Sequence, residues 1–268
     1  MSEYQTKDEF YQDEISKDEM AYIKRTRKKR KKKHYLVRFL VFIAVCVGLG
    51  FFVSSSFFDV TEIKVENNHY YKSDEIINMA NAKVGGNIFW EVNKSEIIGR
   101  LEGNPYFEKV QVKRKFPNVL IIDVAERAQV AAIVYGDKYV VIDTNGVVLR
   151  KTDVEPKLTL LKGLTISKLV EGQPVEAEEK VALGNTLKML TAMENGNLYF
   201  KKIEITKVLI KAYIYDTLIC KGTPKQVLMS IENGDLQKVL NRLFKSETKR
   251  GTITLGSDNY VSFSPDLD

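Results

Sequence analysis

The stretch KRKFPNVLIIDVAERAQVAA, residues 113–132, places an almost unbroken apolar run between two charged clusters. Pro117 presets the backbone of a turn, so we expect a strand on either side of it. The second strand, over residues 119–126, is apolar enough to pack on both faces or to sit at the centre of a sheet. The charged pair Glu126 and Arg127 could serve as an acid and an electrophile. We interpret it instead as a salt-bridged hinge between two folded units.

The residues before this hairpin predict the rest of a small domain. Apolar residues alternate over residues 58–67, as they do in a strand. Ser73 is suited to cap a helix, and Asn93 with Glu96 three positions on resembles a capping box at the start of a second helix. The predicted order over residues 59–126 is therefore strand, helix, helix, strand, strand.

The residues after the hairpin predict a larger unit, over residues 127–268. The expected elements are a hairpin around residues 143–146, strands over 157–161, 198–206 and 207–215, a helix over 176–190, two helices over 223–244 divided at Asn233-Gly234, and closing strands over 251–256 and 259–264. Thr223 and Pro224 suit the start of the later helical segment. The fold class is α+β, with mostly antiparallel strands and packed helices.

Residues 39–58 carry no charge and predict a single transmembrane helix. About 20 residues of helix span roughly 30 Å, which matches the hydrocarbon core of a bilayer. Basic residues precede this segment and Asp59 and Glu62 follow it, so we expect the N-terminus in the cytoplasm and the C-terminal domains outside. A cleaved signal peptide is the alternative. The long leader and the long apolar run argue against it, although Ser54–Ser56 would permit cleavage.

The net charge of +6 belongs to the N-terminal tail. Residues 1–38 hold 12 basic and 7 acidic residues, so of the chain's 41 and 35 the remainder holds 29 and 28. A nucleic-acid-binding domain would carry its positive charge on the folded part, so we expect no nucleic-acid partner. We assign the basic run to membrane topology and to attraction by anionic lipid. Its members are Lys24, Arg25, Arg27, Lys28, Lys29, Arg30, Lys31, Lys32 and Lys33.

Few residues could carry catalysis. A nucleophile–base pair outside the membrane would have to use His69, which we place in a solvated turn. One histidine and Cys220 do not make a zinc site. Gly85-Gly86 lacks the Lys-Ser/Thr sequence that completes a phosphate loop. We therefore predict no catalytic, cofactor-binding or metal-binding residues, and no disulfide between Cys46 and Cys220.

Several segments together resemble the FtsQ/DivIB family of bacterial cell-division proteins. They are the single apolar crossing, FDVTEIKVENN, SDEI, GGNIF, NPYFEKVQVKRKFPNVLIIDVAERAQVA and VIDTNGVVL, of which FPNVLIIDVAER is the most specific. The resemblance implies a basic cytoplasmic tail over residues 1–38, a transmembrane helix over 39–58, a POTRA domain over 59–126 and a β domain over 127–268. It implies no enzymatic activity. It implies a scaffold at the division septum that holds FtsL-like and FtsB/DivIC-like coiled-coil proteins and helps regulate septal wall synthesis.

The resemblance also places partner capture at the end of the β domain, by strand addition. An exposed edge strand offers unpaired backbone N–H and C=O groups, which suits this mode of binding. Carried over to this chain, the edge comprises Asn259, Tyr260, Val261, Ser262 and Phe263, with Tyr260 and Phe263 as anchors. The Asp that the family often has in the preceding strand is missing. The alternative is that Tyr260 and Phe263 fill the core.

Two other functional classes stay open. A membrane-anchored transport or sensor protein could also carry a POTRA domain, although such proteins usually have repeated POTRA units or a barrel, and neither is visible. An anchored cell-wall enzyme would need a cleft with converging acids, which the sequence does not show.

Overall fold

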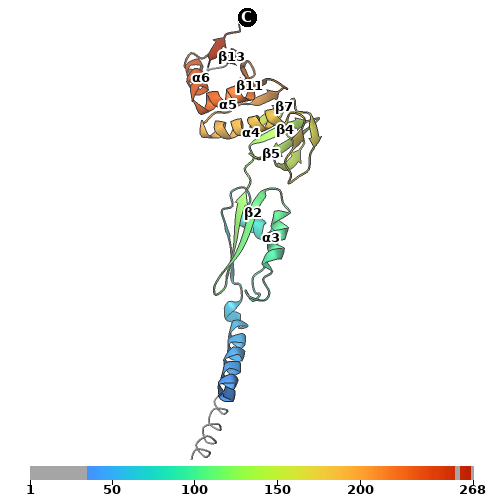
Figure 1. Ribbon diagram of the computed structural model, residues 1–268, viewed down its shortest axis with the longest axis vertical. Helices are drawn as coiled ribbons and strands as arrows, with labels where there is room; N and C mark the ends of the chain where they lie inside the picture. The colour runs from blue at the N-terminus through green and yellow to red at the C-terminus, as the bar shows by residue number, and fades with distance from the viewer. Residues whose placement is uncertain (1–34, 257–259, 267–268) are drawn as a thin grey trace, which may run out of the picture. The chain divides into compact units, whose positions relative to one another are not determined.

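Figure 1 shows a computed structural model of the chain, which describes residues 35–256 and 260–266. The chain divides into two compact units. The first holds the residues up to Glu62 together with Val84–Val92 and Arg114–Val119. The second holds Ile63–Lys83, Asn93–Lys113 and the residues from Leu120 onward.

An apolar helix, Tyr35–Val53, begins the described part of the chain. Its 19 residues have a mean hydropathy of 2.6 and none of this helix is buried against the protein, so its length and composition fit a membrane crossing. The helix ends at Val53, earlier than the predicted limit at residue 58. The Ser55 hydroxyl donates to the Phe52 carbonyl at 2.6 Å, and a 3-10 turn, η1 (Ser56–Phe58), follows.

The small domain has the predicted order of elements, β1, α2, α3, β2 and β3, and its sheet has the order β1-β3-β2. The bounds are β1 (Glu62–Glu66), α2 (Ser73–Ala80), α3 (Lys94–Glu102), β2 (Phe107–Lys115) and β3 (Val119–Glu126). The central position of β3 confirms the interpretation of its apolar run. Every second residue of its first six, Leu120, Ile122 and Val124, is buried, because alternate side chains of a strand point to the same face.

Of the two helix caps predicted in this domain, one is confirmed and the other was wrong. Asn93 caps α3 as predicted, since its side chain accepts a hydrogen bond from the Glu96 N–H at 3.3 Å. The prediction for Ser73 was wrong, because Ser73 is the first helical residue of α2 and Lys72 holds the cap position. The Glu75 carboxylate accepts the Lys72 N–H at 2.8 Å, so a residue inside the helix satisfies the donor at its start.

The large domain is built on a nine-stranded sheet of order β14-β13-β12-β11-β10-β7-β4-β5-β6. Its strands are β4 (Ala131–Tyr135), β5 (Lys138–Ile142), β6 (Val148–Thr152), β7 (Thr159–Lys162), β10 (Lys202–Ile205), β11 (Ile210–Tyr215), β12 (Leu218–Gly222), β13 (Gly251–Leu255) and β14 (Val261–Ser264). A separate pair is β8 (Ile166–Lys168) and β9 (Glu176–Ala177). Neighbouring strands are antiparallel except for the pairs β4–β7, β7–β10 and β12–β13, so the predicted class, α+β with mostly antiparallel strands, is confirmed.

Three helices complete the large domain: α4 (Lys180–Asn195), α5 (Pro224–Glu232) and α6 (Asp235–Lys245). Figure 1 shows α4 and α5 alongside one another. Apolar residues of these helices and of the sheet share one core, with Met189, Phe200 and Ile203 fully buried at its centre. The predicted break at Asn233-Gly234 separates α5 from α6.

The predicted hairpin turn at residues 143–146 joins β5 to β6. Asp143 organises this turn, because its carboxylate accepts the N–H groups of Asn145 and Val147 at 2.8 and 2.7 Å. Gly146 has a φ of 76°, a conformation that glycine adopts without strain.

Candidate partner-binding edge

The strand predicted as a partner-binding edge lies at one end of the nine-stranded sheet. β14 pairs with β13 in antiparallel fashion, with Val261 opposite Leu255 and Phe263 opposite Ile253. Within the described part of the chain, no other strand of the sheet lies beyond β14. Tyr260 directly precedes the strand, and Asn259 lies outside the described residues.

The backbone hydrogen bonds show which residues of β14 face outward. The Gly256 N–H donates to the Tyr260 carbonyl at 2.8 Å, in the same register as the rest of the pair. Bonded and non-bonded pairs alternate along an antiparallel ladder, so Ser262 and Ser264 bond to β13. The N–H and C=O groups of Val261 and Phe263 therefore point away from β13, which is where an added strand would pair.

The two predicted anchor side chains differ in their surroundings. Phe263 packs against the core of the large domain and lies directly over Gly251, where a Cβ atom would come within 2.6 Å of its ring. Gly251 also has a φ of 133°, so glycine is required there for two reasons. Tyr260 is 64% exposed. The core-filling alternative therefore describes Phe263, whereas the Tyr260 side chain is available to a partner.

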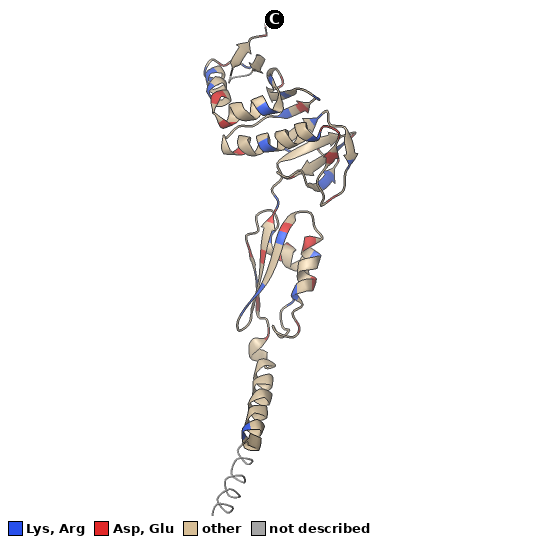
Figure 2. Cartoon of the chain, in the orientation of Figure 1, with Lys and Arg blue, Asp and Glu red and all other residues tan. Residues whose placement is uncertain are grey.

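The opposite edge of the sheet, β6, is protected. It carries Arg150 and Lys151, and residues 171–174 run beside it with backbone bonds between Val148 and both Gly172 and Gln173. β13 and β14 contain no charged residue, and Figure 2 shows both without charge. Charges and covering segments are the usual protection of a strand edge, and among the described residues β14 has neither.

The two residues predicted as a hinge, Glu126 and Arg127, do not pair with each other. The Glu126 carboxylate accepts the backbone N–H groups of His69, Tyr70 and Tyr71 at 2.7, 2.5 and 3.2 Å. The Arg127 guanidinium binds the Asp143 carboxylate at 2.8 Å. Glu126 therefore holds the segment between β1 and α2, and Arg127 holds the turn that follows β5.

The other predicted or considered site residues have ordinary surroundings. The predicted basic run, residues 24–33, lies outside the described residues. His69 contributes only its backbone N–H to Glu126 among the bonds described for it. Burial raises the pKa of the Cys220 thiol to about 12, so this thiol is not a reactive nucleophile. No group of three His, Cys, Asp or Glu residues that could hold a metal ion occurs in residues 35–256 and 260–266.

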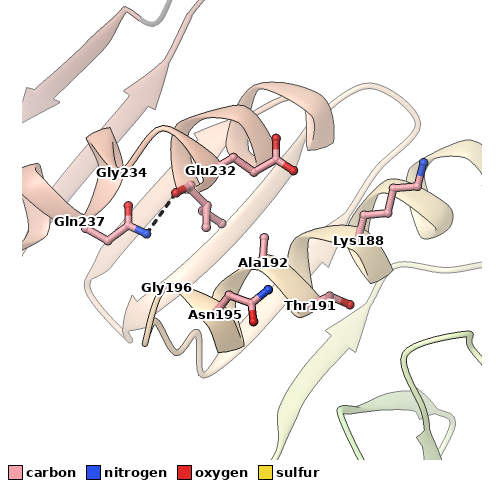
Figure 3. A pocket seen from close by; sticks show the side chains of 9 residues that line it. Lys188, Thr191, Ala192, Asn195, Gly196, Glu232, Gly234 and Gln237 are labelled. Atoms are coloured by element: carbon pink, nitrogen blue, oxygen red, sulfur yellow. Dashed lines mark hydrogen bonds between the residues drawn. The ribbon is translucent and has the colours of Figure 1, made fainter.

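One further hollow lies between α4 and the junction of α5 with α6, with a volume of about 530 Å³ (Figure 3). Gln237 donates to the Ile231 carbonyl at 3.1 Å, while its buried amide oxygen has no partner among the described atoms. Lys188 and Glu232 also line the hollow. The sequence did not predict this hollow, because the residues that line it come from helices far apart in the chain.

Comparison with known proteins identifies the small domain first. A family model described as POTRA domain, FtsQ-type, matches residues 58–127. The chain is 30% identical to the cell division protein DivIB of Clostridium acetobutylicum over 187 residues, which covers 68% of this chain and 74% of that protein. The chain belongs to the DivIB/FtsQ family of cell-division proteins.

Other members of the DivIB/FtsQ family match over similar lengths. The DivIB protein of Clostridium botulinum strain Hall is 29% identical and covers 89% of this chain and 91% of its own length. FtsQ of a Geobacter species, strain M21, is 30% identical over 75% of this chain and 74% of that protein. The solved extracytoplasmic domain of DivIB from Geobacillus stearothermophilus matches 44% of this chain and 97% of that domain at 15% identity, with a TM-score of 0.30. These relatives are all named cell division proteins, and a role in cell division follows for this chain.

Proposed function

We propose that this chain is a non-enzymatic, single-pass membrane scaffold of the bacterial division machinery that captures a partner protein by strand addition at β14. The partners are small coiled-coil division proteins, FtsL-like and FtsB/DivIC-like, as the sequence resemblance implies. The scaffold acts at the division septum and helps regulate septal wall synthesis. Its N-terminus lies in the cytoplasm and both folded domains lie outside.

The observation that supports this proposal best is the difference between the two edges of the large sheet. β6 carries Arg150 and Lys151 and has residues 171–174 beside it, whereas β14 is uncharged and ends the strand order. The outward backbone groups of Val261 and Phe263 offer two donors and two acceptors to a partner strand. Tyr260, 64% exposed, adds an aromatic side chain at the end of this row.

The proposal predicts that Tyr260→Asp weakens capture of an FtsB/DivIC-like partner while the chain stays folded. The introduced charge faces solvent in the free protein and would have to be buried in the complex, which is costly. The change should reduce affinity about tenfold or more, because buried aromatic anchors of an interface commonly contribute 2 kcal/mol or more. The measurement is partner binding to the full chain in detergent or nanodiscs.

Tyr199→Asp is the matched control, because Tyr199 is a similarly exposed aromatic residue, at 57%, elsewhere in the large domain. Val261→Pro tests the backbone directly, since it removes an outward N–H and proline is tolerated on edge strands. We expect Tyr199→Asp to bind normally and Val261→Pro to bind weakly. Normal binding by folded Tyr260→Asp and Val261→Pro variants would remove the edge-strand proposal.

Localisation tests the septal role separately. Immunofluorescence against the C-terminal domains should show a band at the division plane that narrows as the septum closes. An even distribution around the envelope would contradict a septal scaffold and would return attention to the transport and enzyme alternatives.

A further inference from the structure

A continuous row of aromatic rings begins in the last turn of the apolar helix, within the first compact unit. The rings of Phe52 and Phe58 lie 5.3 Å apart, those of Phe58 and Phe89 5.3 Å, and those of Phe89 and Phe116 4.9 Å. Phe57 adjoins this row at Phe58 and Trp90 adjoins it at Phe89. We call these six residues the aromatic cluster: Phe52, Phe57, Phe58, Phe89, Trp90 and Phe116.

The outer members of the aromatic cluster are strongly exposed. Trp90 is 69% exposed, Phe57 is 59% exposed and Phe116 is 56% exposed, and Val84 of the same unit is 59% exposed. Single exposed apolar side chains are ordinary, but a contiguous group of them marks an interaction surface. Such a surface is normally covered by a partner.

Hydrogen bonds hold the aromatic cluster to the end of the apolar helix. The Asn87 side chain, only 5% exposed as a residue, donates to the Val53 carbonyl at the helix end at 2.9 Å. The Ile88 N–H donates to the Phe58 carbonyl at 2.9 Å. Arg114 donates to the carbonyls of Val92 and Phe89 at 3.0 and 3.4 Å, which fixes the loop that carries Trp90. One bond therefore joins the loop to the helix end, and a second joins it to the 3-10 turn that follows the helix.

Because the aromatic cluster is attached to the end of the apolar helix, the lipid surface is the partner that we expect. If the helix Tyr35–Val53 crosses the bilayer, its last carbonyl lies at the outer boundary of the hydrocarbon core, and Asn87 is bonded to it. Tryptophan is enriched at that boundary, where its ring meets both apolar chains and polar headgroups. Charges of both signs flank the rings in sequence, with Glu91 beside Trp90 and Lys115 beside Phe116, so the apolar rings supply the attraction and net charge does not.

We propose that the aromatic cluster inserts into the headgroup region of the outer leaflet, so that the lipid surface itself is a binding partner of the first unit. This inference rests on the proposed placement of the apolar helix across the membrane. The rings of Phe57, Trp90 and Phe116 lie in the interface, and the loops before Trp90 and at Phe116 rest on the membrane.

Trp90 is the chain's one tryptophan, so its fluorescence reports this position alone. The full chain is reconstituted in phosphatidylcholine vesicles, with and without lipids brominated near the headgroup end of the acyl chain. We expect bromine to quench Trp90 and acrylamide in the water to quench it weakly. The matched control is Trp90→Phe combined with Tyr199→Trp, which moves the reporter to an exposed site of the large domain, where acrylamide should quench and bromine should not.

A second variant tests the cluster and not the single ring. Phe57→Ser combined with Phe116→Ser removes two exposed rings, and it should decrease quenching by brominated lipid several-fold. Cys46 reports on the helix in the same sample, because Cys220 is buried and unreactive. A membrane-impermeant maleimide should label Cys46 only after detergent is added.

Three outcomes would overturn the inference. Strong acrylamide quenching with no effect of bromine, while Cys46 stays shielded, would leave the helix across the membrane and the aromatic cluster in water, so the proposed function would stand without this inference. Protection from both quenchers would mean that a protein surface or a second copy of the chain covers the aromatic cluster. Labelling of Cys46 in intact vesicles would mean that the helix does not cross, and both proposals would fail.

Discussion

The pair Glu126 and Arg127 shows how neighbouring charges can serve separate contacts. Their side chains leave the end of β3 toward different segments, so Glu126 accepts three backbone N–H groups and Arg127 binds Asp143. The Arg127 side chain is 18% exposed and the Asp143 side chain 4% exposed. This is a largely buried ion pair, and loss of one partner leaves the other charge without compensation.

At this scale we predict that Arg127→Ala lowers the free energy of unfolding by about 3 kcal/mol. Asp143 keeps its bonds to the N–H groups of Asn145 and Val147, so the loss should lie at the lower end for a buried pair. Chemical denaturation of the full chain measures it. Arg100→Ala is the control, because its pair with Glu96 is exposed on both sides and should contribute less than about 1 kcal/mol. Equal losses in the two variants would contradict this account of Arg127.

A second residue-scale prediction concerns pH. The Lys113 ammonium lies 2.6 Å from Asp123 on the neighbouring strand, and with a further bond from Asn67 it holds the pKa of the Asp123 carboxyl below its usual range. A carboxyl with a lowered folded-state pKa stabilises the fold above its ordinary pKa, and that contribution is lost as pH falls through the folded-state pKa.

Carboxyl NMR titration of the full chain should therefore give Asp123 a midpoint below that of an unpaired Asp. Lys113→Gln should move this midpoint upward, because the first cause of the shift is removed. A midpoint that does not change in Lys113→Gln would show that the lysine does not set it.

At the scale of elements, α5 has the most complete local start signal. Thr223 accepts the Gln226 N–H at 3.2 Å, Gln226 accepts the Thr223 N–H at 2.9 Å, and Pro224 occupies the first helical position. We predict that Thr223→Ala destabilises the protein by about 1 kcal/mol.

Thr191→Ala is the control for this prediction, and thermal melting measures the stability of both variants. Thr191 is an exposed residue in the interior of α4 whose hydroxyl donates to the Leu187 carbonyl of its own helix. Alanine has the higher helix propensity, so this change should be neutral or slightly stabilising. A similar decrease in melting temperature for both variants would contradict the capping role of Thr223.

Elements governed by local signals could be predicted from the sequence. The cap at Asn93, the start at Thr223-Pro224 and the break at Asn233-Gly234 each depend on residues within a few positions. The strand β12 was missed, because the residues between the predicted strand over 207–215 and the predicted helices from residue 223 were assigned to no element. The parallel pairing of β7 with β4 and β10 was also not predicted, because nothing local specifies a partner more than 20 residues away.

At the scale of the whole molecule, a family resemblance located the edge strand, and the structure then distinguished its residues. The family resemblance implied both Tyr260 and Phe263 as anchors, but Phe263 packs on the core over Gly251 while Tyr260 stays exposed. Alternate side chains of a strand point to the same face, so Tyr260 and Phe263, three positions apart, point to opposite faces. Val261 and Phe263 together pack against the core, which leaves the other face to Tyr260.

The protection of the edge strand β6 also could not be predicted from the sequence. Its covering segment, residues 171–174, lies about 20 positions further along the chain, between β8 and β9. The contrast between a protected and an unprotected edge is therefore a property of the complete sheet. It gives the scaffold proposal a physical basis that the family resemblance alone does not.

The most direct test of that proposal is site-specific photo-crosslinking in dividing cells. A photoreactive amino acid replaces Tyr260 in one strain and Tyr199 in another, and crosslinked products are identified by mass. Position 260 should crosslink to a small coiled-coil division protein of the FtsB/DivIC type, and position 199 should not. Equal products from both positions, or no division protein from position 260, would contradict partner capture at β14.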